Sequence, residues 1–160
     1  MAEAGQEAED GSVSLEADTL RYSVGGALVW ELPIESVRVI GELTTDGGPW
    51  SDDHFLVFVV AGHPPLFHEV PVEGAPSTTL LNALSYRLGA PLVLGLVNRT
   101  DFASRVMWPP QLTDHDLFRF HPEPRSGGLW SRAMDALVPM LSHALTEEVV
   151  HYAEQADSSI

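Results

Sequence analysis

The chain has 160 residues, 44% of them hydrophobic, and a formal net charge of −15. This length and hydrophobic content predict one globular domain rather than a disordered or membrane-embedded chain. The chain contains no cysteine, which excludes disulfides, zinc–thiolate centres and thiol nucleophiles. All eight basic residues are arginine, so chemistry that needs a lysine, such as a Schiff base or a Walker-type phosphate site, is excluded as well.

The negative charge is concentrated at the two ends of the chain. Residues 1–18 contain six acids and no base, and residues 147–160 contain four acids and no base. The other 13 acids face eight arginines, which leaves a net charge of −5 over residues 19–146. A negative field repels nucleic acid and anionic lipid and attracts basic protein. We therefore expect a protein partner with basic character, no nucleic acid and no membrane.

Both ends are expected to be disordered, over residues 1–11 and 156–160, because they are small, polar and acidic. The N-terminus lacks the basic and apolar regions of a secretory signal, and no stretch has the roughly 20 apolar residues of a membrane span. These features predict a cytoplasmic protein. Residues 12–155 are expected to form a single α+β domain.

Residues 12–97 carry the signals of a β-rich core. Gly25-Gly26 suits the positive φ angles of a tight hairpin turn, and Pro33 is expected to interrupt a hydrogen-bond ladder. Seven short segments have the alternation or the continuous apolar character of strands: residues 13–15, 20–24, 27–32, 34–40, 55–60, 66–72 and 91–97.

Two helices are predicted. The first spans residues 77–88, with Ser77 as its N-cap, leucines along one face and Gly89 as its C-terminal stop. The second spans residues 129–155, where apolar side chains recur at near-helical spacing, and Pro139 is expected to kink it. Between the helices, residues 98–128 contain four prolines and are expected to form an irregular belt packed on the domain.

The segment LEADTLRYSVGGALVWELPIESVRVIGE, with the order of strands and helix that follows it, resembles the small bacterial pleckstrin-homology-like domains. Those domains pair short hairpins, continue with a strand that ends in an Ile-x-x-Val turn, here Ile34 to Val37, and close with a helix. The resemblance covers residues 12–89 and implies an antiparallel, partly open β-barrel or strongly bent sheet closed by a helix. It also implies a binding scaffold rather than an enzyme. Only Arg21 and Gly25-Gly26 stand where phosphoinositide-binding versions have a basic loop, which argues against lipid headgroup recognition.

The acidic loop over residues 44–54 is the main candidate for a protein contact. Tryptophan is enriched at interaction hot spots, and Trp50 lies among three aspartates. Trp108, just before Pro109-Pro110, is a second candidate, with internal packing as the alternative. The predicted contact residues are Asp46, Trp50, Asp52, Asp53 and Trp108.

No catalytic residue, metal site or cofactor is predicted. The acidic loop lacks the EF-hand spacing, and the sequence contains no Gly-x-Ser-x-Gly elbow and no glycine-rich phosphate loop. His63 and His68 are five residues apart on a turn and a strand, and His143 and His151 lie in the predicted second helix without a zinc-protease spacing.

The sequence therefore predicts a non-catalytic protein-interaction module, and three alternatives stay open. The first is an acidic immunity or antitoxin-like protein that neutralises a basic toxin. The second is a metal-dependent hydrolase or cupin-like enzyme that uses Asp52, Asp53, His54, His63 or His68. The third is a homo-oligomeric structural subunit that forms a homodimer through its C-terminal helix.

Overall fold

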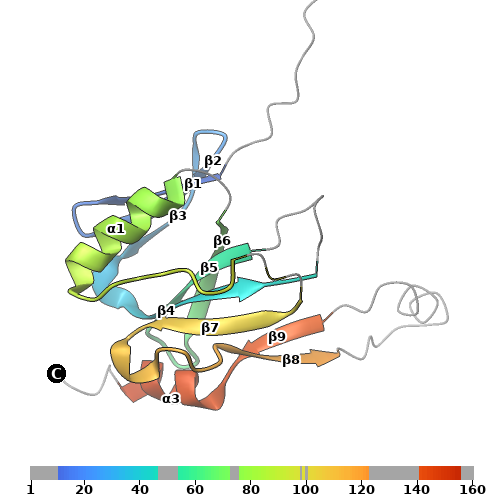
Figure 1. Cartoon of the computed structure of the whole chain (residues 1–160). Coiled ribbons are helices and arrows are strands. Elements are labelled where there is room, and N and C mark those ends of the chain that lie inside the picture. The colour runs from blue at the N-terminus through green and yellow to red at the C-terminus, as the bar shows by residue number, and fades with distance from the viewer. Residues whose placement is uncertain are drawn as a thin grey trace, which may run out of the picture.

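The computed structural model describes residues 11–46, 54–72, 76–97, 99, 101–122 and 141–155, and Figure 1 shows their arrangement. These residues form an α+β structure in which every paired strand is antiparallel to its neighbour. The strands belong to three sheets, which we name the N-terminal, central and C-terminal sheets. The predicted α+β class is confirmed.

The N-terminal sheet is a meander of three short strands: β1 (Gly11–Glu16), β2 (Thr19–Val24) and β3 (Ala27–Pro33). Gly25 and Gly26 connect β2 to β3 with φ angles of 56° and 80°. Glycine adopts these angles without a steric penalty, so the hairpin predicted at this position is confirmed. Pro33 is the last residue of β3, and a 3₁₀ turn over Ile34–Ser36 leads into the central sheet.

The central sheet has four strands in the order β6-β5-β4-β7. Its two middle strands are buried on both faces, which explains their nearly continuous apolar sequences. The strands predicted over residues 55–60 and 66–72 are confirmed, whereas the one predicted over 34–40 is wrong over Ile34–Ser36, which form the 3₁₀ turn. The strand bounds are β4 (Val37–Thr44), β5 (His54–Val60), β6 (Leu66–Pro71) and β7 (Ala103–Trp108).

The N-terminal sheet and helix α1 (Pro76–Leu88) cover one face of the central sheet (Figure 1). Helix α1 begins one residue before the predicted start and is followed by Gly89 at φ 66°, the left-handed conformation that commonly ends helices. The buried side chains between these layers include Ile40, Leu56, Phe58, Val70, Leu80 and Leu84.

The C-terminal sheet and helix α3 (Glu147–Gln155) cover the opposite face. This sheet pairs β8 (Phe118–Pro122) with β9 (Leu141–Leu145). Each large apolar side chain that these contacts bury contributes about 1.5–3 kcal/mol. The buried side chains on this side include Val39, Leu43, Val57, Val59, Leu117 and Val149. Within the described ranges the strands form three separate sheets and no closed barrel.

The irregular belt expected over residues 98–128 is wrong over Ala103–Trp108 and Phe118–Pro122, which form β7 and β8. The prolines mark where the strands end. Pro109 directly follows β7, and Pro122 is the last residue of β8. Proline removes a ladder hydrogen bond only at its own position, so it limits a strand without preventing one beside it.

The helix predicted over residues 129–155 is wrong over Leu141–Leu145, which forms β9. The strand is favoured because β8 supplies a partner along its whole length, with Leu145 opposite Phe118 and buried in the core. Helix α3 starts after Thr146, whose carbonyl accepts a hydrogen bond from the Val150 N–H at 3.0 Å. The predicted kink at Pro139 lies outside the described residues.

The strand expected over residues 91–97 is also wrong. This segment is extended, but among the described residues it pairs with no strand. Its backbone is held by hydrogen bonds to the side chains of Glu42, Arg105 and Ser85 instead of by a neighbouring strand.

The remaining expectations concern the ends of the chain and membranes. The predicted disordered tails lie outside the described residues, except that Gly11 belongs to β1. Neither of the helices that the structure describes combines the length and hydrophobicity needed to cross a bilayer.

Candidate functional site

The predicted contact residues do not meet in one described site. Asp46 is exposed just after β4, whereas Trp50, Asp52 and Asp53 lie outside the described residues. Trp108 ends β7 and is partly buried against the core beneath α1. Internal packing therefore accounts for part of the Trp108 surface, and the role of these residues in a protein contact stays a prediction.

The three histidines named for the metal-dependent enzyme have different neighbours. His54 Nε2 lies 2.8 Å from Glu42 Oε2, and His63 Nδ1 lies 3.6 Å from Glu154 Oε1. His68 packs against Trp30 with ring centroids 5.1 Å apart, and burial lowers the pKa of His68. The described part of the chain contains no group of three or more histidine, aspartate or glutamate side chains placed to hold a metal ion.

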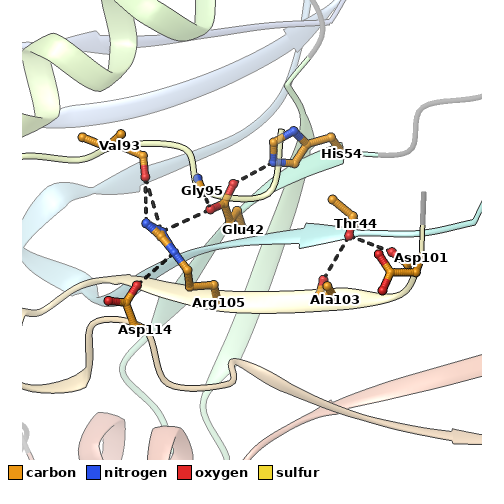
Figure 2. Close-up of polar contacts among 9 residues, drawn as sticks. All are labelled: Glu42, Thr44, His54, Val93, Gly95, Asp101, Ala103, Arg105 and Asp114. Carbon is orange, nitrogen blue, oxygen red and sulfur yellow. Dashed lines mark hydrogen bonds and ion pairs between the residues drawn. The ribbon is translucent and has the colours of Figure 1, made fainter. Parts of the chain in front are cut away.

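Glu42, in the middle of β4, is the centre of a buried polar network (Figure 2). Its side chain is fully buried, and it accepts hydrogen bonds from the Gly95 N–H at 2.6 Å and from Arg105 Nη1 at 3.2 Å. Burial raises the pKa of Glu42, but the hydrogen bonds from His54, Gly95 and Leu96 and the charge of Arg105 outweigh it, so the pKa is lower than that of an ordinary glutamate.

The Glu42 network holds the extended segment 91–97 over the face of the central sheet. Arg105 Nη2 donates to the Val93 carbonyl at 2.9 Å, and the Leu92 N–H donates to Ser85 Oγ of α1 at 2.9 Å. The segment buries Leu92 and Leu96 and exposes Val93 and Val97. The fully buried Glu42 carboxylate cannot reach a substrate, so this network positions chain segments rather than performing chemistry.

The outer edge of β7 is capped at one end and open at the other. The Val106 N–H donates to the His115 carbonyl at 2.8 Å, and the Asp114 N–H donates to the Val106 carbonyl at 3.0 Å. Alternate residues of an antiparallel strand direct their backbone groups to the same edge, so Ser104 faces outward like Val106. The Ser104 N–H and carbonyl are thus directed away from β4, and outside the strand ladders the described residues place no backbone partner on them.

The start of β8 is held to β7 by the hydroxyl of Ser104. Ser104 Oγ accepts hydrogen bonds from the Phe118 N–H at 2.9 Å and from the Leu117 N–H at 3.2 Å. Farther along, the rings of Phe102 and Phe120 meet with centroids 5.7 Å apart. The free edge of β7 is therefore flanked by phenyl rings.

A pocket of about 390 Å³ lies along this edge, and we name it the edge pocket. Both arginines that line it are already paired. Arg99 makes two hydrogen bonds to Asp101, at 2.9 and 2.7 Å, and Arg105 pairs with Glu42 and with Asp114. Its lining residues are Leu96, Arg99, Phe102, Ala103, Ser104, Arg105, Asp114, Asp116, Phe118 and Phe120.

No family model, curated protein or solved structure matches this chain. What the edge pocket can bind therefore follows from its own residues. It offers a backbone donor and acceptor on β7, phenyl rings and the exposed carboxylate of Asp116, for which the described chain supplies no partner. This set suits an extended polypeptide better than an anion, because neither arginine is free.

The sequence interpretation missed the edge pocket residues. One signal was readable: Phe118, Arg119, Phe120 and His121 alternate in the pattern of a half-buried strand. The free backbone groups of Ser104 had no readable signal, because they depend on which strand lies next to β7.

We expect the Ser104 amide hydrogen to exchange with solvent at least about tenfold faster than that of Arg105, because only the Arg105 amide faces β4. Hydrogen exchange of the full chain, followed residue by residue by NMR, measures this difference. The Val106 amide, capped by His115, is the matched control and should exchange slowly. Equal protection of Ser104 and Val106 would show that the edge is not free.

Proposed function

We propose that this chain is a non-catalytic protein-interaction module that receives an extended segment of another protein on the free edge of β7. The observation that carries the proposal is the edge pocket, which lies along a stretch of β7 with unpaired backbone groups. An exposed strand edge is a template for a further strand. Added strands are recognised through main-chain hydrogen bonds, and neighbouring side chains select the sequence.

The size of the free edge sets the strength of binding that we expect. Val106 is occupied by the turn at Asp114 and His115, so an added strand pairs with β7 only from Ser104 toward Phe102. A net contribution of about 0.5–1.5 kcal/mol per backbone hydrogen bond makes this pairing alone a weak interaction. The rings of Phe102 and Phe120 supply apolar area, so the affinity depends on an apolar side chain of the partner.

The positions of the other polar groups favour binding over catalysis. The shortest contact between a histidine and a carboxylate among the described residues joins His143 Nε2 of β9 to Glu69 Oε1 of β6, at 2.5 Å. His143 is packed against Phe118 and Phe67, with ring centroids 4.7 and 5.8 Å away. The pair connects the C-terminal sheet to the central sheet, so its role is structural.

The resemblance of residues 12–89 to pleckstrin-homology-like domains forms part of the same proposal. A run of six antiparallel strands followed by a helix is compatible with it. In that family the fold is a scaffold for binding, and the partly open barrel or strongly bent sheet is the arrangement we propose for this part of the chain. A protein partner fits the resemblance and the acidic charge together.

Selection of a random nonapeptide library on the full chain tests the proposed function. We expect enriched peptides to slow the exchange of the Ser104 amide hydrogen and to leave that of Val106 unchanged. Methylating the peptide backbone at alternate nitrogens should weaken binding about tenfold, because it removes main-chain donors. The proposal is wrong if no peptide is enriched, or if enriched peptides protect amides elsewhere and leave Ser104 unprotected.

A further inference from the structure

We infer that the segment bound in the edge pocket carries a basic side chain for Asp116 and an apolar side chain for Phe102 and Phe120, on the same face of the added strand. This inference rests on the proposed function and specifies its partner. It follows from the balance of charges around the pocket and from the positions of the rings along β8.

The charges around the edge pocket leave one carboxylate uncompensated. Beyond the paired arginines, Glu148 lies 2.8 Å from His115, and Glu147 lies 3.3 Å from Arg119. Asp116 is exposed, and the described residues place no cation beside its carboxylate. The pocket therefore presents an acceptor for a basic side chain and repels an acidic one.

The charge of the whole chain acts in the same direction. A net charge of −15 produces a long-range attraction for basic segments, which raises the rate of association and is weakened by salt. Long-range attraction alone does not choose where a segment binds. The local choice comes from Asp116, which lies next to the unpaired backbone of β7.

The spacing of the partner's two side chains follows from strand geometry. Strand β8 begins at Phe118, and Asp116 lies two residues before it, while Phe120 lies two residues after its start. Asp116 and the Phe102–Phe120 ring pair line the same pocket. Side chains of an added strand point to the same face only at even separations. We therefore expect the basic and the apolar residue to be two or four positions apart.

The nonapeptides enriched on the full chain are the probe for this inference. We expect them to contain arginine or lysine two or four positions from an aliphatic or aromatic residue. In the strongest binder, replacing the basic residue with glutamate should raise the Kd at least about tenfold at low salt, and the difference should shrink at high salt. Fluorescence polarisation of labelled peptide measures both effects.

The variant Asp116→Arg should reverse this preference, so that the glutamate peptide binds more tightly than its basic parent. Asp116→Asn, which keeps the size of the side chain, should make the two peptides equivalent. The matched control is Glu35→Arg, which makes the same charge change at an exposed residue of the Ile34–Ser36 turn outside the edge pocket and should leave the preference for the basic peptide in place.

The outcomes separate this inference from the proposed function. Peptides that protect the Ser104 amide but bind equally well with arginine or glutamate would overturn the inference and leave the interaction module intact. Loss of the basic preference in Glu35→Arg and its retention in Asp116→Arg would also overturn it, because the charge selection would then not come from Asp116. Peptides that fail to protect Ser104 would overturn both.

Discussion

Gly41→Ala is expected to lower the free energy of unfolding by about 3 kcal/mol, near the upper end of the usual effect of overpacking. A Cβ atom at Gly41 would lie 2.6 Å from Leu117 Cδ2 and 2.7 Å from the backbone carbonyl oxygen of Arg105. Both separations are shorter than any contact that carbon atoms tolerate. The Leu117 side chain could turn away, but the carbonyl belongs to β7, which pairs with β4 at this position.

Urea denaturation followed by tryptophan fluorescence measures this effect, with Gly26→Ala as the matched control. Gly26 has open space around its Cα but a φ angle of 80°, so alanine there costs only the backbone strain, about 1–2 kcal/mol. Adding Leu117→Ala to Gly41→Ala should not restore stability, because the carbonyl contact remains and Leu117 itself is buried. A Gly41→Ala protein more stable than Gly26→Ala would contradict the close approach of Leu117 and of the Arg105 carbonyl to Gly41.

Glu42→Gln is expected to lower the free energy of unfolding by about 3 kcal/mol, the range found when one partner of a buried ion pair is removed. The substitution keeps the shape of the side chain but leaves Arg105 without its buried countercharge. An amide also cannot accept hydrogen bonds at both of its ends, whereas the Glu42 carboxylate contacts Gly95 and Arg105 through one oxygen and His54 through the other. The same denaturation experiment measures the loss.

The matched control for Glu42→Gln is Glu31→Gln. Glu31 forms an exposed ion pair with Arg21 at 3.4 Å, and exposed pairs contribute less than about 1 kcal/mol. Equal effects of the two substitutions would show that burial of the Glu42 network adds nothing to stability.

The pH dependence of stability gives Glu42 a second signature. The pKa of Glu42 is lower in the folded chain than in the unfolded chain. At pH values between these two pKa values the folded state therefore binds fewer protons than the unfolded state. The stabilisation is complete above the ordinary glutamate pKa of about 4.3 and is lost as the pH falls through the lowered pKa of Glu42. The difference between the original chain and Glu42→Gln should therefore be largest above about pH 5 and shrink in more acidic solution. A difference that stays constant down to pH 3 would contradict the lowered pKa.

The elements that could be predicted from sequence are those whose local residue pattern favours the same structure as their packing in the fold. Residues 55–60 are apolar enough to require burial on both faces, and they form β5 in the centre of the central sheet. Gly25-Gly26 and Gly89 mark turns that few other residues can adopt, and each lies where predicted.

The elements that could not be predicted depend on partners distant in sequence. The segment 91–97 is as apolar as a strand, but it lies where Glu42 and Arg105 bind its backbone and where no strand edge is available to it within the described chain. Leu141–Leu145 fits a helical spacing, but the edge of β8 makes it a strand. Thr146 followed by two glutamates was a readable sign that a helix begins there.

The candidate site was still harder to predict, because its central feature is a pair of backbone groups. The sequence singles out Trp50 and Trp108 by residue type, whereas Ser104 is ordinary in type and unusual only in position. Its hydroxyl is used by Leu117 and Phe118, and its main chain stays open because the neighbouring turn reaches only as far as Val106. Such a combination exists only after the sheet order is known.

The turn at Asp114 and His115 has a consequence for how a guest strand would be aligned. Asp114 adopts a φ angle of 70°, a conformation that aspartate tolerates better than most residues. In this turn the Asp114 N–H and the His115 carbonyl both form hydrogen bonds with the backbone of Val106. A guest that slid along β7 would collide with this turn after one step. The turn therefore limits an added strand to one register on β7. It also prevents two copies of the chain from pairing edge to edge along the full length of β7.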